Sequence, residues 1–158
     1  MSTPPDLSAI CQRCGLCCDG TLFPAARLEE EEVEPMRKHG LAILREGGGV
    51  GFEQPCPQLE RASCSCSIYL DRPRTCRRFE CSLLSRARTG AIPVQAAVDA
   101  VARTREIIAT LQAKGMDMSP GAPRTISGSG DDAYELMSLV AELMERLHGD
   151  FSRASPET

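Results

Sequence analysis

Four cysteines fall within eight residues near the start of the chain, in the stretch CQRCGLCC at residues 11–18. Two cysteines separated by two residues let one tight turn aim both sulfurs at one metal ion, and Gly15 frees the backbone for that turn. The stretch contains two overlapping pairs of this kind, Cys11/Cys14 and Cys14/Cys17. Because successive side chains rarely point the same way, the adjacent Cys17 and Cys18 are expected to face two different metals or the rim of one polynuclear site.

Five further cysteines follow, and the second half of the chain has none; they are Cys56, Cys64, Cys66, Cys76 and Cys81. Structural zinc takes four ligands and a [4Fe–4S] cluster takes four thiolates, so two such sites would leave one of the nine cysteines over. We assign Cys64 as the spare, because it is separated from Cys66 by a single residue. The predicted ligands are the other eight: Cys11, Cys14, Cys17, Cys18, Cys56, Cys66, Cys76 and Cys81.

The spacing leaves open whether the metal is zinc or iron, and whether there are one or two centres. Bacterial ferredoxins use C-x2-C-x2-C followed by x3-C-P. The first part is present at residues 11–17, but Cys18 follows at once, and the next Cys-Pro pair lies at residues 56–57. The predicted cofactor is therefore zinc or iron, with a [4Fe–4S] cluster as one form of the iron site.

Arginines surround the last two cysteines in DRPRTCRRFEC at residues 71–81. Positive charge beside thiols lowers their pKa and offsets the net negative charge of a metal–thiolate centre. Tyr69, Arg72 and Arg77 are predicted to surround the ligands and hydrogen-bond to sulfurs or backbone. A solvated basic face is the second interpretation. Nucleic-acid binding is the third, since the chain offers few aromatic residues as stacking platforms.

The overall composition favours a cytoplasmic metal-binding protein. The N-terminus lacks the basic and apolar regions of a secretory signal, and no apolar run approaches the ~20 residues of a membrane span. Clustered cysteines in such a protein more often bind metal than form disulfides. The net charge of −4 argues against attraction to nucleic acid or membranes. The expected partners are a metal ion and an unidentified protein, with no membrane.

The predicted fold is mostly α with minor β: a single small domain over residues 1–158 with a loop-rich N-terminal half organised by metal. Residues 29–40 read as a helix that starts with acids, 46–51 as a flexible loop, and 52–81 as loops and turns. Apolar residues at helical spacing predict a helical region over 93–148, with helices at 93–114 and 131–148 that pack on each other and on the cysteine-rich part. Asp132 and Glu135 suggest a capping box. A turn-rich link over 118–130 and a flexible tail over 149–158 complete the prediction.

The long cysteine pattern resembles a known family. C-x2-C-G-x-CC at 11–18, QPCPQL at 54–59 and CSIYLDRPRTCRRFEC at 66–81 are similar to the signature of the YkgJ-type cysteine-cluster proteins, the CxxCxxCC family. The resemblance covers roughly residues 11–84 and implies zinc or iron chelation by the eight cysteines, with Cys64 outside the set.

Some members of this family are linked to flagellin lysine N-methylation, and many are labelled Fe–S oxidoreductases. The resemblance therefore implies two enzymatic alternatives to plain metal binding, and a zinc-dependent nucleic-acid-binding module remains a third. No catalytic constellation can be read beyond the cysteines. The run Glu29–Glu32 reads as a solvated helix start, and His39 and His148 as residues at helix ends.

Overall fold

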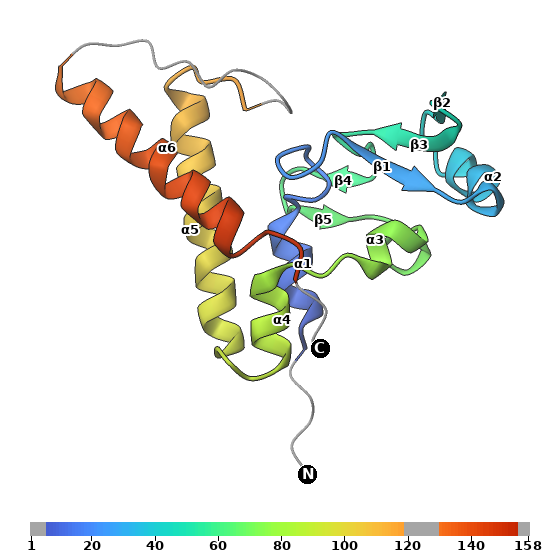
Figure 1. Cartoon of the computed structure of the whole chain (residues 1–158), viewed down its shortest axis with the longest axis horizontal. Helices are drawn as coiled ribbons and strands as arrows, with labels where there is room; N and C mark the ends of the chain where they lie inside the picture. The colour runs from blue at the N-terminus through green and yellow to red at the C-terminus, as the bar shows by residue number, and fades with distance from the viewer. Residues whose placement is uncertain (1–5, 119–129, 155–158) are drawn as a thin grey trace. The chain divides into compact units, whose positions relative to one another are not determined.

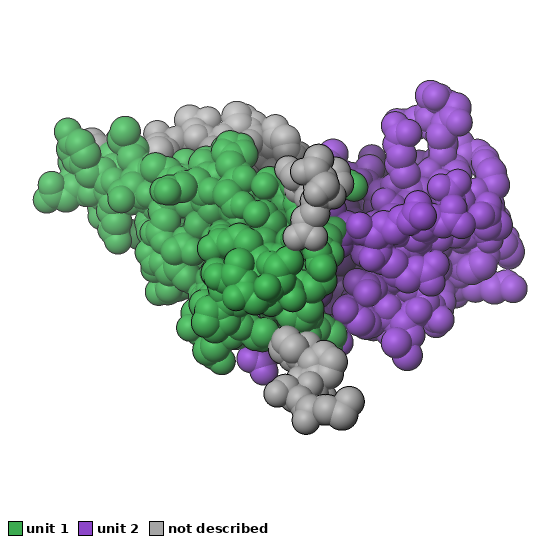
Figure 2. All heavy atoms as spheres, turned by 60° about the horizontal axis from the view of Figure 1, so that its bottom comes forward, with its two compact units in different colours: residues 1–10, 80–158 green, residues 11–79 purple. Residues whose placement is uncertain are grey.

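The structure is a computed structural model that describes residues 6–118 and 130–154. It divides into two compact units, one of residues 11–79 and one of residues 1–10 with 80–158 (Figure 2). The described residues contain six α-helices and a few short strands, and about half of these residues are helical. This agrees with the predicted mostly α composition with minor β. The link predicted over 118–130 lies largely outside the described residues.

A three-stranded antiparallel sheet forms the centre of the unit of residues 11–79, with the strand order β1-β3-β2 (Figure 1). Its strands are β1 (Ala25–Leu28), β2 (Leu44–Glu46) and β3 (Gly49–Glu53). Residues 46–51, predicted as a flexible loop, instead form a hairpin between β2 and β3. Gly47 and Gly48 make its turn with φ of 57° and 79°, a conformation that glycine adopts without steric cost.

Helix α2 (Glu30–Lys38) covers one face of this sheet. Its first turn is acidic and its last turn is basic, which suits the helix dipole, and the helix predicted over 29–40 is confirmed. Pro35 lies inside the helix on its exposed side. The core of the unit consists of buried apolar residues from the helix and the sheet: Leu28, Val33, Met36, Leu41, Val50 and Phe52.

Short elements hold the segments that carry the cysteines. They are α1 (Ser8–Cys14), β4 (Leu59–Glu60), β5 (Ser65–Cys66), the 3-10 helix η1 (Tyr69–Asp71) and α3 (Arg74–Arg78). Strands β4 and β5 pair as a small antiparallel hairpin, and α3 packs against β1. Most of residues 54–79 therefore depends on neighbouring segments for its conformation, because elements this short are marginal alone.

The other unit is a helical assembly of α4 (Ser82–Arg88), α5 (Val94–Ala113) and α6 (Asp131–Gly149). Helices α5 and α6 contact each other, and α4 contacts α5. Leu111 and Leu143 are fully buried, as their place in the two apolar stripes predicts. The two long helices match the predicted ranges to within one residue, whereas α4 was not predicted. No helix within the described ranges combines the length and apolarity needed to cross a membrane.

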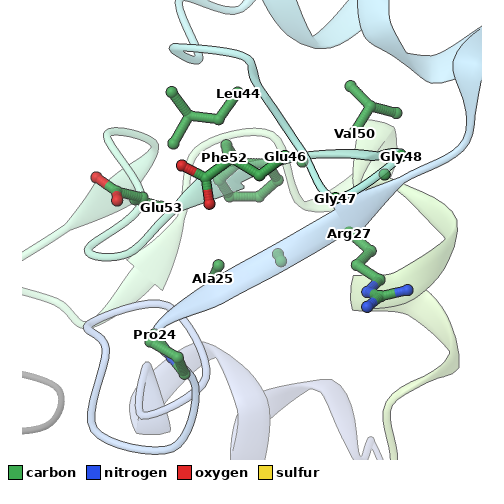
Figure 3. Close-up of a pocket in the computed structure, with 13 residues that line it drawn as sticks. Pro24, Ala25, Arg27, Leu44, Glu46, Gly47, Gly48, Val50, Phe52 and Glu53 are labelled. Atoms are coloured by element: carbon green, nitrogen blue, oxygen red, sulfur yellow. The ribbon is translucent and has the colours of Figure 1, made fainter.

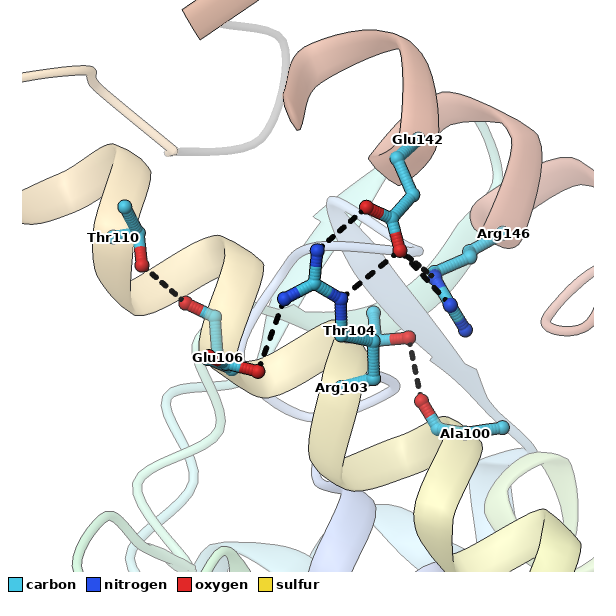
Figure 4. A network of polar contacts seen from close by, with 7 residues as sticks. All are labelled: Ala100, Arg103, Thr104, Glu106, Thr110, Glu142 and Arg146. Atoms are coloured by element: carbon cyan, nitrogen blue, oxygen red, sulfur yellow. Dashed lines mark hydrogen bonds and ion pairs between the residues drawn. The ribbon is translucent and has the colours of Figure 1, made fainter. Parts of the chain in front are cut away.

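Polar contacts also join α5 to α6 (Figure 4). The Arg103 guanidinium donates two hydrogen bonds to the Glu142 carboxylate, from Nε to Oε1 at 3.0 Å and from Nη2 to Oε2 at 2.7 Å. Arg146 donates to the same carboxylate from within α6 at 2.9 Å. The buried Thr104 hydroxyl donates to the Ala100 carbonyl oxygen one turn earlier at 2.8 Å. Paired charges therefore bridge the two helices beside their apolar contact.

Two predictions for the ends of α6 differ from the structure. The residue before α6 is Gly130, with no side-chain cap, so the capping box expected from Asp132 is wrong. At the other end, Phe151 is buried, and the N–H of Leu83 donates to the Asp150 carbonyl oxygen at 2.7 Å. Residues 150–154 thus pack against α4 instead of forming the start of a flexible tail, while 155–158 lie outside the described residues.

Candidate metal centre

The stretch at 11–18 combines the last turns of a helix with a tight turn. Cys11 and Cys14 lie one turn apart in α1, and Cys14 is buried. Gly15 ends the helix at φ 62°, as its position in the motif predicts. The N–H of Cys18 then donates to the Gly15 carbonyl oxygen at 2.9 Å. The chain therefore leaves the helix at Gly15, and Cys17 and Cys18 lie in the turn that follows.

A backbone hydrogen bond joins this turn to the second cysteine segment. The N–H of Cys56 donates to the carbonyl oxygen of Cys18 at 2.7 Å. Two residues earlier, the N–H of Gln54 donates to the Pro24 carbonyl oxygen at 2.9 Å, next to the β1–β3 pairing. The segment after β3 therefore lies beside the turn that follows α1, with Cys56 next to Cys18.

Four cysteines from separate segments meet in one electrostatic environment: Cys18, Cys56, Cys66 and Cys76. We call this set the four-thiol cluster. Burial, and to a smaller extent the other three thiols, raise the pKa of Cys18 to about 12. Burial first, and then Cys56 and Cys66, raise the pKa of Cys76 to about 11. These effects of one thiol on another place the four residues in the same region of the unit, because such interactions weaken with distance.

The cluster lies against the apolar core of its unit. Cys56 and Cys76 both pack on the core cluster formed by α2 and the sheet. Burial also raises the pKa of Cys56, and the N–H of Gln58 partly offsets the shift. Low dielectric surroundings make unpaired thiolates costly, and the same surroundings strengthen thiolate bonds to a cation. The donor set therefore suits a positively charged occupant.

One of the predicted arginines acts on the cluster. Arg72 lowers the pKa of Cys76, whereas Glu32 raises it, both as smaller effects than burial. The guanidinium of Arg72 lies 3.7 Å from the Tyr69 ring centroid, and its Nε donates to the Tyr69 carbonyl oxygen at 2.9 Å. Tyr69 thus orients the cation that offsets thiolate charge at Cys76, while Arg77 is exposed on α3.

The fit of the cluster to zinc or iron follows from its chemistry. Four cysteine sulfurs are the donor set of closed zinc sites and of iron–sulfur clusters. Among residues 6–118 and 130–154, however, no three His, Cys, Asp or Glu side chains are already close enough to hold a metal ion. Metal binding would therefore require the four sulfurs to move closer together than they are in this structure.

The remaining predicted ligands are placed differently. Cys11, Cys14 and Cys17 lie on α1 and the turn after it. Cys81 belongs to the other unit, where it is the N-cap of α4 and its sulfur accepts the N–H of Leu84 at 3.4 Å. Burial raises the pKa of Cys81, and backbone N–H groups partly offset the shift. Cys81 thus has a capping role that sequence reasoning did not identify.

Cys64, the predicted spare, stands in the turn between β4 and β5 with φ 56°. Its sulfur contacts the Arg61 carbonyl oxygen at 3.7 Å. A left-handed conformation is unusual for a residue other than glycine. The backbone conformation of Cys64 is therefore part of the turn between β4 and β5. Its exclusion from the ligand set stays a prediction.

The acidic run Glu29–Glu32 does more than start a helix. One oxygen of Glu32 accepts the N–H of Arg74, the first residue of α3, at 2.6 Å. The Arg74 guanidinium lies 3.9 Å from Glu29 and 3.7 Å from Glu31. The predicted solvated helix start is confirmed, because Glu29, Glu30 and Glu31 are exposed, and Glu32 in addition contacts the start of α3. No local sequence signal connects residues so far apart.

A comparison with family models covers this cysteine-rich region. Residues 10–105 match the CxxCxxCC model, which is described as a "putative zinc- or iron-chelating domain". The chain belongs to the CxxCxxCC family. The match extends beyond the expected residue 84 to include α4 and the first half of α5. Among curated proteins and among solved structures, none shows significant similarity to the chain.

A separate hollow bears on the enzymatic alternatives for this CxxCxxCC protein. It holds about 450 Å³ and lies over the hairpin and β1, among Arg27, Leu44 and Glu53 (Figure 3). The lining of this hollow, taken over the described residues, contains no cysteine or histidine. The hollow is therefore formed without any of the predicted ligand cysteines.

Proposed function

We propose that this protein binds zinc or iron through the thiolates of the four-thiol cluster. The observations that carry the proposal are the backbone hydrogen bond from the N–H of Cys56 to the Cys18 carbonyl oxygen at 2.7 Å, and the effect of Cys56, Cys66 and Cys76 on the pKa of Cys18. Four sulfurs from four chain segments match the number and type of donors that a tetrahedral site needs, although they would have to move closer together to bind one metal. When bound, the metal would supply a cross-link between segments that otherwise share few contacts.

The charge balance supports the same assignment. Four thiolates on a divalent cation carry a net charge of −2, which needs a nearby cation or solvent. Arg72, held on the face of Tyr69, stands beside Cys76 and meets that need in part. Cys66 and Cys56 remain half-buried, so solvent screens the rest. The surroundings of the cluster thus stabilise a metal–thiolate centre better than four free thiolates.

The three thiols of α1 and its turn are proposed as ligands of a second centre. Cys11 and Cys14 are one helical turn apart, which places their sulfurs on one face of α1. Cys17 is adjacent to Cys18 in sequence and follows the turn at Gly15. Cys81, which lies in the other unit, stays a predicted metal ligand without an assigned centre. The two-centre form of the proposal predicts two metals per chain.

A chelating role is favoured over the alternatives. Four protein sulfurs leave no open coordination position for a substrate, which an oxidoreductase or a methylation-related enzyme would use. The arginines that could bind nucleic acid have acidic partners: Arg74 with Glu29 and Glu31, Arg86 with Asp150, and Arg88 with Glu80. These pairs reduce the positive field that phosphate binding needs.

The decisive experiment is anaerobic purification followed by metal analysis and absorption spectroscopy. Stoichiometric zinc in a colourless protein would identify a zinc site. A brown protein with sulfur-to-iron charge-transfer bands would identify an iron–sulfur cluster. A protein that is isolated without metal, and that takes up neither Zn²⁺ nor Fe²⁺ under reducing conditions, would refute the proposal.

A further inference from the structure

Glu32 connects the beginnings of two helices. Its Oε2 accepts the N–H of Glu29 at 3.0 Å, which completes a capping box at the start of α2. Its Oε1 accepts the N–H of Arg74 at 2.6 Å, at the start of α3. The first N–H groups of any helix lack partners within the helix. One carboxylate therefore satisfies such groups at both helix starts.

The bond between Glu32 and Arg74 is the directional contact between these helices. A carboxylate that accepts a backbone N–H forms a short, charge-assisted hydrogen bond. The side-chain pairs of Arg74 with Glu29 and Glu31 are longer, at 3.9 Å and 3.7 Å, and are exposed to solvent. Exposed pairs of this kind contribute little. The orientation of α3 thus depends on Glu32 more than on the surrounding charges.

Cys76 follows Arg74 by two residues within α3, which has five residues. A helix this short has few internal hydrogen bonds and is not stable alone. Where it begins and which way it points are fixed by outside contacts: Glu32 at its start, and the core that Cys76 packs on. The placement of the Cys76 sulfur near Cys18 follows from those contacts.

We infer that Glu32 is a positioning residue of the proposed metal centre, which fixes the start of α3 and so holds the Cys76 sulfur where the other three thiols meet. The inference rests on the proposed function. Both carboxylate oxygens of Glu32 already accept hydrogen bonds, so Glu32 acts through Cys76 and is not itself a ligand.

The test is a titration of the whole metal-free chain with Co²⁺, followed by competition with Zn²⁺. E32A removes both acceptors and is expected to weaken Co²⁺ binding about 10- to 100-fold, the usual loss when a group that orients a ligand is removed. The sulfur-to-cobalt charge-transfer band should fall toward that of C76A, which has one thiolate fewer. E32Q keeps one acceptor and should recover most of the affinity and the band.

A second variant isolates the backbone hydrogen bond. R74P removes the donating N–H, and proline is well tolerated at the first position of a helix. Pro73 has ψ 159°, which suits a residue that precedes proline. Relative to R74A, R74P should weaken Co²⁺ binding by the same factor as E32A. The double variant E32A/R74P should bind Co²⁺ as tightly as E32A/R74A, because without Glu32 the N–H of residue 74 has no carboxylate to donate to.

The control is E34A on the same helix, where the exposed Glu34 side chain pairs with Arg37 at 3.0 Å. E34A should bind Co²⁺ as the wild type does. Wild-type affinity and an unchanged band in E32A would overturn the inference, even if the unfolding free energy of the metal-free variant fell, because that result would make Glu32 purely structural. A wild-type protein that gives no sulfur-to-cobalt band would overturn the proposed function itself.

Discussion

The N–H of Cys56 donates to the carbonyl oxygen of Cys18 at 2.7 Å, across 38 positions of sequence. This bond joins the CxxCxxCC stretch to the cysteine that follows the sheet. The bond brings the segments of Cys18 and Cys56 side by side. Cys66 and Cys76 belong to the same group of thiols, because they also raise the pKa of Cys18. A backbone hydrogen bond therefore connects the first and second parts of the family signature, independently of any bound metal.

Removing a single thiol of the four-thiol cluster should abolish stoichiometric metal binding. C66S is expected to weaken metal affinity by about 100-fold or more, a larger loss than changes outside the ligand set produce. C64S is the matched control, since it lies two residues away in the same hairpin, and it should retain the metal. Metal content after dialysis against a chelator is the measurement. Loss of metal in C64S but not in C66S would reverse the assignment.

Metal binding should release protons and weaken in acid. Burial raises the pKa of Cys18 to about 12 and that of Cys76 to about 11, so both are protonated near pH 7 without metal. Each must lose its proton to bind, so apparent affinity should fall about 100-fold per pH unit on acidification from these two thiols alone. Calorimetry in buffers of different ionisation enthalpy counts the protons. An affinity independent of pH would contradict the prediction.

The same pKa shifts predict an alkaline limit for the metal-free fold. The folded values lie above the ordinary thiol value of 9.0, so the folded state holds protons that the unfolded state loses. The contribution of these two protonated thiols to the unfolding free energy should be fully present below about pH 9 and should be lost as the pH rises through about 11 to 12. Urea unfolding of the metal-free protein at pH 8 and pH 10.5 measures the decline. C18S should show a shallower dependence than the wild type.

The helices were predictable because their signals are local. The stripes that contain Leu111 and Leu143 repeat at helical spacing, and acids and bases mark the two ends of α2. Helix α4 escaped prediction because it is only seven residues long and begins at a cysteine cap. The hairpin escaped because Gly47 and its neighbours obscure the alternation that marks a strand.

The sequence predicts a list of ligand cysteines but not how they group in space. Spacing and ligand counting nominate eight cysteines from Cys11 to Cys81, and the family resemblance implies the same eight. The meeting of Cys18 with Cys76 depends on strand pairing and on the contact between Glu32 and Arg74. Such contacts join residues far apart in the chain, and a single sequence carries no pattern for them.

Gly51 is expected to be irreplaceable in β3. A Cβ at this position would overlap the Ala26 carbonyl oxygen of the paired strand, and backbone cannot move aside cheaply. G51A should lower the unfolding free energy by about 1–3 kcal/mol, the usual cost of overpacking. G49A is the control in the same strand, because its Cβ would meet only the Glu46 carbonyl oxygen at an ordinary 3.6 Å. Equal stability of G51A and G49A in urea unfolding would refute the close approach of β1 and β3.

The charge network between α5 and α6 should give the helical unit an acid-sensitive component. The hydrogen bonds from Arg103 lower the pKa of Glu142 to about 2, below its ordinary 4.5, so this stabilisation is present above about pH 4.5 and is lost as the pH falls through about 2. Glu142 is about a third exposed and Arg103 more so, and solvent screening therefore keeps the contribution of the pair small. E142Q should therefore flatten the stability difference between pH 5 and pH 3, measured by urea unfolding of the whole chain under circular dichroism. E145Q, an exposed change on the same helix, is the control, and an E142Q profile that matches it would show that the network adds nothing in solution.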